Sequence, residues 1–342
     1  MFFRSISTLC LAVVAFPGGP MLRAEENVLS SMTEAVQAVF ENTKASIVKI
    51  RSSDKHGRCV GSGFFVDPNG TIYTTYAVAG ESDNITVEMG DRRYDAKRLV
   101  ADPRSGVVLL KVDAKTPFLP IGKTAELSIA SPVVAIGYPM DLPVTPTLGF
   151  IGGFDLKYLD RYFTTTHIRA NVSVQRGESG APLINTRGEV VGILISGLDG
   201  GSACYALPIE AAEKIRSDYV RYGEVRHGWI GITVRETTEK QAGSVAVIDE
   251  LSERTPAAHS GIQKDDVLVR IGTVPVTKPE DVLNGSYFLT AGEDVSVGVV
   301  RGGENLTFTV PATEHPFSAK AREVKALTKT DFGENLSLTS GN

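Results

Sequence analysis

One serine of this chain stands in a setting that suits nucleophilic chemistry. Ser179 lies in the glycine-rich run Gly177-Glu178-Ser179-Gly180. A serine hydroxyl is a poor nucleophile at neutral pH, so it needs an adjacent base, usually histidine, and a carboxylate that orients this base. The chain has five histidines, and none lies between His56 and His167. The sequence therefore offers a nucleophile whose base has to be sought separately.

Composition argues against two other kinds of site. The chain has no CxxC motif and no cluster of cysteine and histidine, so we expect no metal site and no cofactor. The net charge of the 342 residues is −5. Without Arg4 and Arg23, 33 basic residues face 40 acidic ones, which makes the remainder −7. This balance argues against nonspecific binding of nucleic acid, which requires a basic face.

The N-terminus has the pattern of a secretory signal over residues 1–24. A short basic start precedes an apolar stretch at 6–16, which is too short to span a bilayer, and Ala24 offers a small residue for cleavage. An uncleaved membrane anchor is the alternative. We expect an exported protein, periplasmic or secreted, with no integral membrane segment after cleavage. Its remaining cysteines, Cys59 and Cys204, either form one disulfide or stay as thiols.

The chain after residue 24 divides into two β-rich units with helical connections. Within residues 25–44, the apolar residues at 31–41 have the spacing of a helix. Residues 209–222 are also expected to form a helix. Residues 45–222 otherwise alternate short β-rich runs with turns, which favours two small barrels or a sandwich. The expected strands here are 46–51, 63–66, 71–75, 85–88, 107–112, 133–136, 163–168, 182–184, 190–195 and 203–207.

The second unit covers residues 223–313 and is followed by a polar tail at 314–342 that we expect to be disordered. Its pattern indicates strands at 231–234, 244–248, 267–271, 295–300 and 306–310, with helices at 256–260 and 279–289. This mixture is typical of a small α/β domain.

Short segments in a fixed order carry a family pattern. They are GSGFFVD at 61–67, IYTTYAV at 72–78, DPRSGVVLLKVD at 102–113 and GESGAPL at 177–183. In this order they resemble the trypsin-like domain of the HtrA/DegP family of exported serine proteases. GWIGI at 228–232 and TPAAHSGIQKDDVL at 255–268 resemble a PDZ domain. The resemblance implies a mainly β fold, a trypsin-like double six-stranded β-barrel followed by a five- to six-stranded PDZ domain, and trimeric assembly.

The resemblance also assigns the catalytic positions one by one. The family motif places Ala77 where the base stands and Gly106 where the orienting carboxylate stands, whereas Ser179 keeps the nucleophile position. Alanine cannot take a proton and glycine cannot hold an imidazole. The oxyanion hole of the family consists of backbone N–H groups, here those of Ser179 and Gly177, which tolerate changes of side chain. His56, His167 or Asp102 would have to supply a relocated base, although each has an ordinary turn or surface role as its alternative.

The PDZ resemblance implies a second binding site. PDZ domains add a peptide C-terminus as a strand and receive its carboxylate on backbone N–H groups. The receiving loop would be Gly228, Trp229, Ile230 and Gly231, the pairing strand would start with Ile232 and Val234, and Val282 and Leu283 would line the opposite wall. A PDZ domain that only packs on its neighbour is the alternative.

Three hypotheses about function remain open on the sequence. The first is a pseudoprotease that binds peptide or protein C-termini or unfolded protein segments as a scaffold, regulator or holdase. The second is an active serine endopeptidase of protein quality control that uses Ser179 and a relocated base. The third is a non-catalytic subunit of a family oligomer. The missing base and carboxylate favour the first hypothesis.

Overall fold

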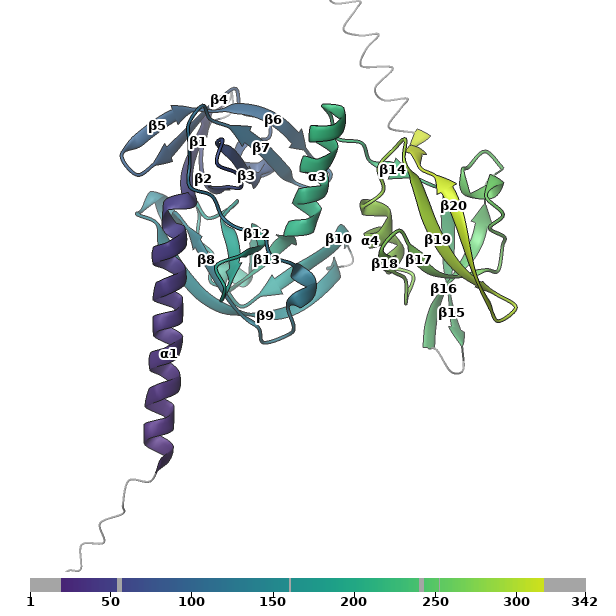
Figure 1. Cartoon of the computed structure of the whole chain (residues 1–342), viewed down its shortest axis with the longest axis horizontal. Coiled ribbons are helices and arrows are strands. Elements are labelled where there is room, and N and C mark those ends of the chain that lie inside the picture. The colour runs from purple at the N-terminus through teal and green to yellow at the C-terminus, as the bar shows by residue number, and fades with distance from the viewer. Residues whose placement is uncertain (1–19, 54–56, 160, 240–242, 252, 317–342) are drawn as a thin grey trace, which may run out of the picture.

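The computed structural model describes residues 20–316, except 54–56, 160, 240–242 and 252 (Figure 1). Most of the predicted signal peptide and nearly all of the predicted polar tail lie outside the described residues. Within this part of the chain, no helix is both long and apolar enough to cross a membrane.

The first unit begins with a seven-stranded antiparallel sheet in the order β5-β4-β1-β2-β3-β7-β6. Its two edge strands follow one another in the chain, separated only by Ala96, whose N–H donates to the Ile85 carbonyl (2.9 Å). The sheet therefore curls until its edges come together. Its strands are β1 (Ile47–Ser53), β2 (Arg58–Phe65), β3 (Thr71–Thr75), β4 (Asn84–Met89), β5 (Arg92–Asp95), β6 (Lys97–Asp102) and β7 (Val107–Lys111).

The second sheet closes into a six-stranded barrel, in the order β10-β13-β12-β11-β8-β9. Three apolar clusters stabilise this unit: one inside the first sheet, one inside the barrel, and the largest between the two sheets and helix α3. The strands are β8 (Pro132–Gly137), β9 (Thr145–Tyr158), β10 (Arg161–Ala170), β11 (Pro182–Asn185), β12 (Val190–Leu198) and β13 (Ala203–Pro208).

Helices flank the two sheets. Helix α1 (Pro20–Thr43) extends away from the body of the molecule, and α3 (Ile209–Tyr222) runs along both sheets toward the second unit (Figure 1). Helix α3 ends at Gly223, whose left-handed backbone (φ 74°) lets its N–H bond the Tyr219 carbonyl. The short helices are α2 (Tyr76–Ala79), η1 (Lys44–Ser46), η2 (Thr124–Glu126), η3 (Pro139–Asp141) and η4 (Asp199–Gly201).

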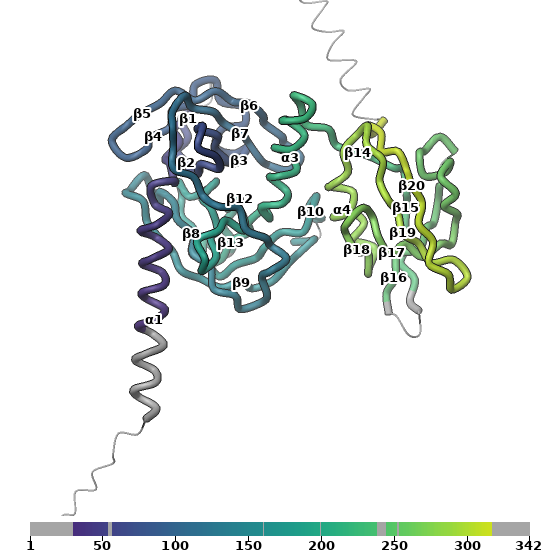
Figure 2. Tube along the Cα trace, viewed as in Figure 1, coloured from purple at the N-terminus to yellow at the C-terminus, as the bar shows by residue number. Residues whose placement is uncertain are grey.

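Among its described residues, the C-terminal unit consists of a sheet and one α-helix, and it lies beside the first unit (Figure 2). It has its own apolar core. The sheet order is β15-β16-β17-β19-β20, with β18 paired to β17, and β14 and β21 form a separate pair. The elements are β14 (Gly228–Trp229), β15 (Ile232–Glu239), β16 (Gly243–Leu251), η5 (Ala257–His259), β17 (Val267–Ile271), β18 (Val274–Pro275), α4 (Asp281–Tyr287), β19 (Asp294–Arg301), β20 (Glu304–Pro311) and β21 (Thr313–Glu314).

Several expectations need correction. The N-terminal sheet has seven strands rather than six, because one strand bends at Ala96 and is divided into β5 and β6. The sequence pattern missed β9 because prolines and glycines interrupt it, yet a Cβ on Gly149 would lie 2.3 Å from the Asn171 carbonyl oxygen, so close strand packing requires glycine there. The helix expected at 256–260 is a single 3-10 turn, and the last strand reaches Glu314, one residue beyond the expected boundary.

The C-terminal unit docks on the first one through α4. The Tyr287 side chain is fully buried in the apolar cluster between the two sheets and α3, and its hydroxyl donates to the Ala211 carbonyl (3.1 Å). Asn284 Oδ1 accepts hydrogen bonds from Thr165 Oγ1 (2.6 Å) and from the Thr166 N–H (3.2 Å) on β10. A buried aromatic ring and two hydrogen bonds thus fix the position of this helix.

A second contact between the units gives stability a dependence on pH. His227 Nε2 lies 3.0 Å from Asp102 Oδ1. Burial alone would raise the pKa of Asp102, but hydrogen bonds from His227 and from the Ser105 N–H outweigh it and hold this pKa below its ordinary value. Because the folded pKa is lowered, the contribution of this carboxylate is complete above the ordinary value of 3.8 and is lost as the pH falls below it.

We therefore expect Asp102→Asn to lower the free energy of unfolding by about 1–3 kcal/mol at pH 7, through loss of a charge-assisted hydrogen bond. Urea unfolding of the wild-type and variant proteins at pH 7 and at pH 3 measures this. The difference between them should shrink at pH 3, and a difference that is equal at both pH values would contradict the assignment.

Candidate active site

Ser179 lies in the loop before β11, where the curled sheet meets the barrel. The Ser62 N–H of β2 donates to the Ser179 carbonyl (2.9 Å) and holds the loop between the two sheets. Glycine is required on both sides of Ser179. A Cβ on Gly180 (φ 86°) would lie 2.2 Å from the Ser62 carbonyl oxygen, and one on Gly177 (φ 95°) would lie 2.3 Å from that of Tyr138.

The Ser179 hydroxyl contacts oxygen atoms. Its Oγ lies 2.9 Å from Thr75 Oγ1 and 3.4 Å from the Ile195 carbonyl oxygen. Thr75 is the last residue of β3, and Ala77 follows it in α2, exposed to solvent. Ala77 and Ser179 line the same cleft of about 480 Å³, which contains no histidine among the described residues. The structure therefore brings the predicted base position and the predicted nucleophile position into one cleft.

Gly106, the predicted carboxylate position, lies behind α2. Its carbonyl accepts a hydrogen bond from the Tyr76 N–H (2.7 Å), which fixes the first turn of α2 and thus the place of Ala77. The backbone of Gly106 is left-handed (φ 76°), and a Cβ there would meet no atom within 4 Å. The position has space for a side chain but a backbone conformation that most residues avoid.

The peptide groups beside Ser179 are firmly oriented. Ser62 Oγ donates to the Gly177 carbonyl (2.7 Å), and the Met140 N–H donates to the Arg176 carbonyl (2.5 Å). Because the C=O and N–H of a trans peptide point in opposite directions, the Gly177 N–H points away from Met140. Within the described part of the chain, neither the Gly177 nor the Ser179 N–H has an acceptor. These two donors remain available to a ligand oxygen.

The loop predicted to receive a peptide carboxylate connects β14 to β15. Gly228 and Trp229 pair with β21, and the indole ring lies edge-on to His315 (5.1 Å between centroids). The buried Ile230 accepts the Ala257 N–H at its carbonyl (3.0 Å). Gly231 has a left-handed backbone (φ 76°), and a Cβ there would lie 2.3 Å from Thr255 Cβ.

The predicted groove walls are an edge strand and a helix. Strand β15 is at one end of its sheet and pairs only with β16 among the described strands. Ile232 and Val234 on β15 and Val282 on α4 are partly buried against the same apolar cluster. Leu283 lies outside this cluster and is 40% exposed. The structure thus brings three of the four predicted wall residues to one apolar core.

Comparisons with known proteins place this arrangement in a family. Residues 61–193 match the trypsin-like peptidase domain, and residues 228–312 match the PDZ domain. A DegP-like periplasmic serine endoprotease of Pseudomonas fluorescens is 33% identical over 275 residues, which is 75% of this chain and 57% of the relative. The chain belongs to the HtrA/DegP-like family. A second DegP-like relative, from Ectopseudomonas mendocina, is 32% identical over 298 residues, 83% of this chain and 62% of that protein.

Solved structures of HtrA-type proteins have the same fold. The HtrA-type protease AlgW with a tripeptide superposes with a TM-score of 0.68 at 22% identity, over 82% of this chain and 97% of that one. A serine endoprotease from Yersinia pestis superposes with a TM-score of 0.58 at 25% identity, over 82% and 98%. The HtrA-like chain spans only 57–62% of the length of the two DegP-like relatives.

The other residues considered as bases lie away from Ser179 or outside the described part. His56 is not among the described residues. His167 is buried in β10, stacked on Phe163 (4.1 Å), with Nδ1 at 2.8 Å from the Thr165 carbonyl oxygen, and burial lowers its pKa. Asp102 faces His227 rather than the cleft. Sequence reasoning missed Glu178. Burial raises the pKa of this carboxyl group, and its Oε2 accepts a hydrogen bond from the Gln175 N–H (2.6 Å).

Thr75, Cys59, Arg58 and Arg176 also line or border the cleft, and sequence reasoning missed them. Cys59 and Cys204 are both thiols and do not form a disulfide. The signal that could have pointed to Thr75 and Cys59 is their nearness in sequence to the motifs at 61–67 and 72–78. Nothing in the sequence indicated that Arg176 faces the same cleft as Arg58.

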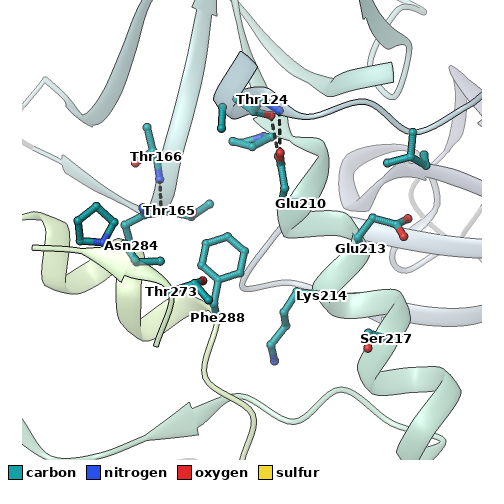
Figure 3. Close-up of a pocket in the computed structure, with 15 residues that line it drawn as sticks. Thr124, Thr165, Thr166, Glu210, Glu213, Lys214, Ser217, Thr273, Asn284 and Phe288 are labelled. Carbon is teal, nitrogen blue, oxygen red and sulfur yellow. Dashed lines mark hydrogen bonds between the residues drawn. The ribbon is translucent and has the colours of Figure 1, made fainter. Parts of the chain in front are cut away.

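A larger cavity of about 620 Å³ lies between the protease and PDZ domains (Figure 3). Glu210 on α3 accepts both the N–H and the hydroxyl hydrogen of Thr124 (2.6 Å each) across one wall, and Asn284 binds β10 across another. Lys214 donates instead to Asp218 (2.5 Å) and to the Arg226 carbonyl (3.0 Å). Of these contacts, those of Asn284 with β10 and of Lys214 with the Arg226 carbonyl join the two domains beside the cavity.

Proposed function

We propose that this HtrA-like chain is an exported pseudoprotease that binds peptides or unfolded protein segments. One observation carries the proposal: the Ser179 hydroxyl contacts only Thr75 Oγ1 and the Ile195 carbonyl among the described residues, while the exposed Ala77 stands in the base position. A threonine hydroxyl does not accept a proton at neutral pH. Within the described part of the chain, the nucleophile therefore has no group beside it that could activate it.

The size of the catalytic contribution that a histidine base makes supports a role other than hydrolysis for this chain. Loss of the histidine from a Ser-His-Asp triad lowers kcat about 10⁶-fold, and only the contribution of the oxyanion hole and of substrate binding remains. In this chain the Gly177 and Ser179 N–H groups, at the positions that the resemblance assigns to this hole, have no acceptor among the described residues. Binding without turnover is the function that these groups still support.

The PDZ domain supports peptide capture. An edge strand with unpaired N–H and C=O groups is a template for an added strand, and the glycine-containing loop before β15 is the place where a terminal carboxylate would be received. AlgW structures with a tripeptide and with a decapeptide show that proteins of this fold bind peptides. The DegP-like relatives are periplasmic, which supports export and periplasmic binding for this chain too.

A non-catalytic place in an oligomer has a separate observation in its favour. An apolar groove of about 370 Å³ lies between α1 and the barrel, lined by Met32, Leu148 and Phe150, and Phe150 is 41% exposed. A second copy packed against α1 and β9 would cover these side chains, in keeping with the trimer that the resemblance implies. Measurement of the molar mass in solution tests this, and the mass of a single chain would contradict it.

Fluorophosphonate labelling tests the main proposal. The purified protein, a Ser179→Ala variant and an active family member are treated in parallel, and the modified residue is mapped by mass spectrometry. We expect the protein to be labelled no more than the Ser179→Ala variant, under conditions in which the active family member is labelled to completion. Rapid labelling of Ser179 would mean that a base acts on it, with His56 the first residue to replace, and that the chain is an endopeptidase.

A further inference from the structure

The cleft beside Ser179 gathers positively charged side chains. Arg58 and Arg176 line it, and neither guanidinium forms an ion pair or hydrogen bond with another described residue. Asp141 also lines the cleft, and its carboxylate is held by Lys49 (2.7 Å) and Arg51 (2.8 Å). Among the described residues, the cleft therefore presents two cations without a carboxylate partner.

The residues that carry the two N–H donors line the same cleft. Gly177 and Ser179 line it together with both arginines, and their N–H groups have no acceptor in the described part of the chain. Backbone donors of this kind suit an oxygen that carries negative charge, and guanidinium groups bind a planar carboxylate through two parallel hydrogen bonds. A histidine in place of Ala77 would occupy part of this space.

We propose that the former catalytic cleft is a receptor for a peptide carboxylate, bound by the Gly177 and Ser179 N–H groups and by Arg58 and Arg176. This inference rests on the proposed function, because a ligand is retained only where it is not turned over. Val60, Val78 and Met140 add apolar surface to the lining, which suits the side chain of the residue that bears the carboxylate. This site is separate from the PDZ loop, which is built by the other domain.

Cys59 provides a reporter inside the cleft. It is half-buried and lines the cleft with Arg58 and Ser179. Cys204 is fully buried, and burial raises its pKa to about 12, so its thiol is inert at neutral pH. The rate at which iodoacetamide alkylates Cys59, measured by peptide mass spectrometry, therefore reports occupancy of the cleft and is blind to binding at the PDZ loop.

The experiment compares three probes: N-acetyl-Ala-Val with a free C-terminal carboxylate, its C-terminal amide, and N-acetyl-aspartate α-amide, which is blocked at its α-carboxyl and free at its side chain. We expect the free carboxylates to slow alkylation of Cys59 and the neutral amide to leave it unchanged. Protection by the first probe alone assigns a chain terminus, and protection by the third as well assigns an acidic side chain. Equal protection by the amide, or none by any probe, would overturn the proposal.

Charge-neutral variants test the two arginines. Arg58→Gln and Arg176→Gln should each weaken protection by the carboxylate about tenfold or more, as expected for loss of a charge-assisted hydrogen bond. Arg92→Gln is the matched control, because Arg92 is exposed on β5 and outside the cleft. Protection that persists in the double arginine variant would overturn the proposal.

The two proposals fail separately. Fluorophosphonate labelling of Ser179 with intact carboxylate protection would refute the pseudoprotease and leave the receptor. An unlabelled Ser179 without protection of Cys59 would refute the receptor and leave the pseudoprotease.

Discussion

The Ala77→His variant should label at Ser179 with fluorophosphonate about 50- to 100-fold faster than the wild-type protein. In a Ser-His-Asp triad, loss of the histidine lowers kcat about 2 × 10⁶-fold, and loss of the aspartate alone lowers it about 3 × 10⁴-fold. Restoring the histidine without its carboxylate should therefore increase the rate by the ratio of these two factors. Ala77 is exposed in the same cleft as Ser179, which leaves space for an imidazole. The rate of active-site labelling measures the gain.

Two controls keep this result specific. Ala77→Gln has a side chain of similar size that cannot act as a base, and it should label like the wild-type protein. Ala77→His combined with Ser179→Ala should not label at all. If Ala77→His stays as unreactive as Ala77→Gln in a folded protein, the assignment of residue 77 as the base position is wrong.

Addition of Gly106→Asp to Ala77→His should increase the rate of labelling further. The increase should be smaller than the factor of about 3 × 10⁴ by which loss of the aspartate lowers kcat in a triad. The open space at Gly106 accepts a side chain, whereas its φ of 76° is strained for most residues. Aspartate is one of the few side chains that tolerate this conformation. The remaining cost of this conformation should keep the gain below the full effect of the carboxylate.

The largest effect on stability is expected from Asp218→Ala, which should lower the free energy of unfolding by about 3–5 kcal/mol. Asp218 is 3% exposed and accepts hydrogen bonds from Lys214 (2.5 Å), from the Arg226 N–H (2.9 Å) and from Thr290 (3.0 Å). These donors belong to α3, to the segment that connects the domains and to the PDZ domain. Removal of the carboxylate takes away the acceptor of the Arg226 N–H and of the Thr290 hydroxyl, and it leaves the buried Lys214 charge with only the Arg226 carbonyl (3.0 Å).

Urea denaturation with two optical probes measures this loss. Burial lowers the pKa of Lys214, which shows that the ammonium group is costly to bury even beside its partner. The double variant Lys214→Met with Asp218→Leu removes both charges and should be markedly more stable than Asp218→Ala. A double variant that is as unstable as the single one would mean that packing, rather than an unpaired charge, causes the loss.

Local patterns predicted most of the elements. The strands at 71–75 and 267–271 and the helix at 209–222 have the expected bounds, because apolar periodicity and terminal glycines are properties of neighbouring residues. Strand β9 was missed for the same reason: its glycines look like turn residues until β10 and the following residues are packed against them. A sequence pattern cannot show which backbone will approach a glycine from a distant part of the chain.

The sequence by itself determined the two-domain fold, Ser179 between two glycines, and the absence of a histidine and a carboxylate from the motifs around 77 and 106. These follow from residue identity and local spacing alone. Only the tertiary structure decided that Thr75 meets Ser179 across 104 positions, that Arg58 and Arg176 share one cleft, and that Tyr287 is buried in the neighbouring domain. Such contacts depend on how the sheets curl and dock, and the free energy that selects them is spread over residues far apart in the chain.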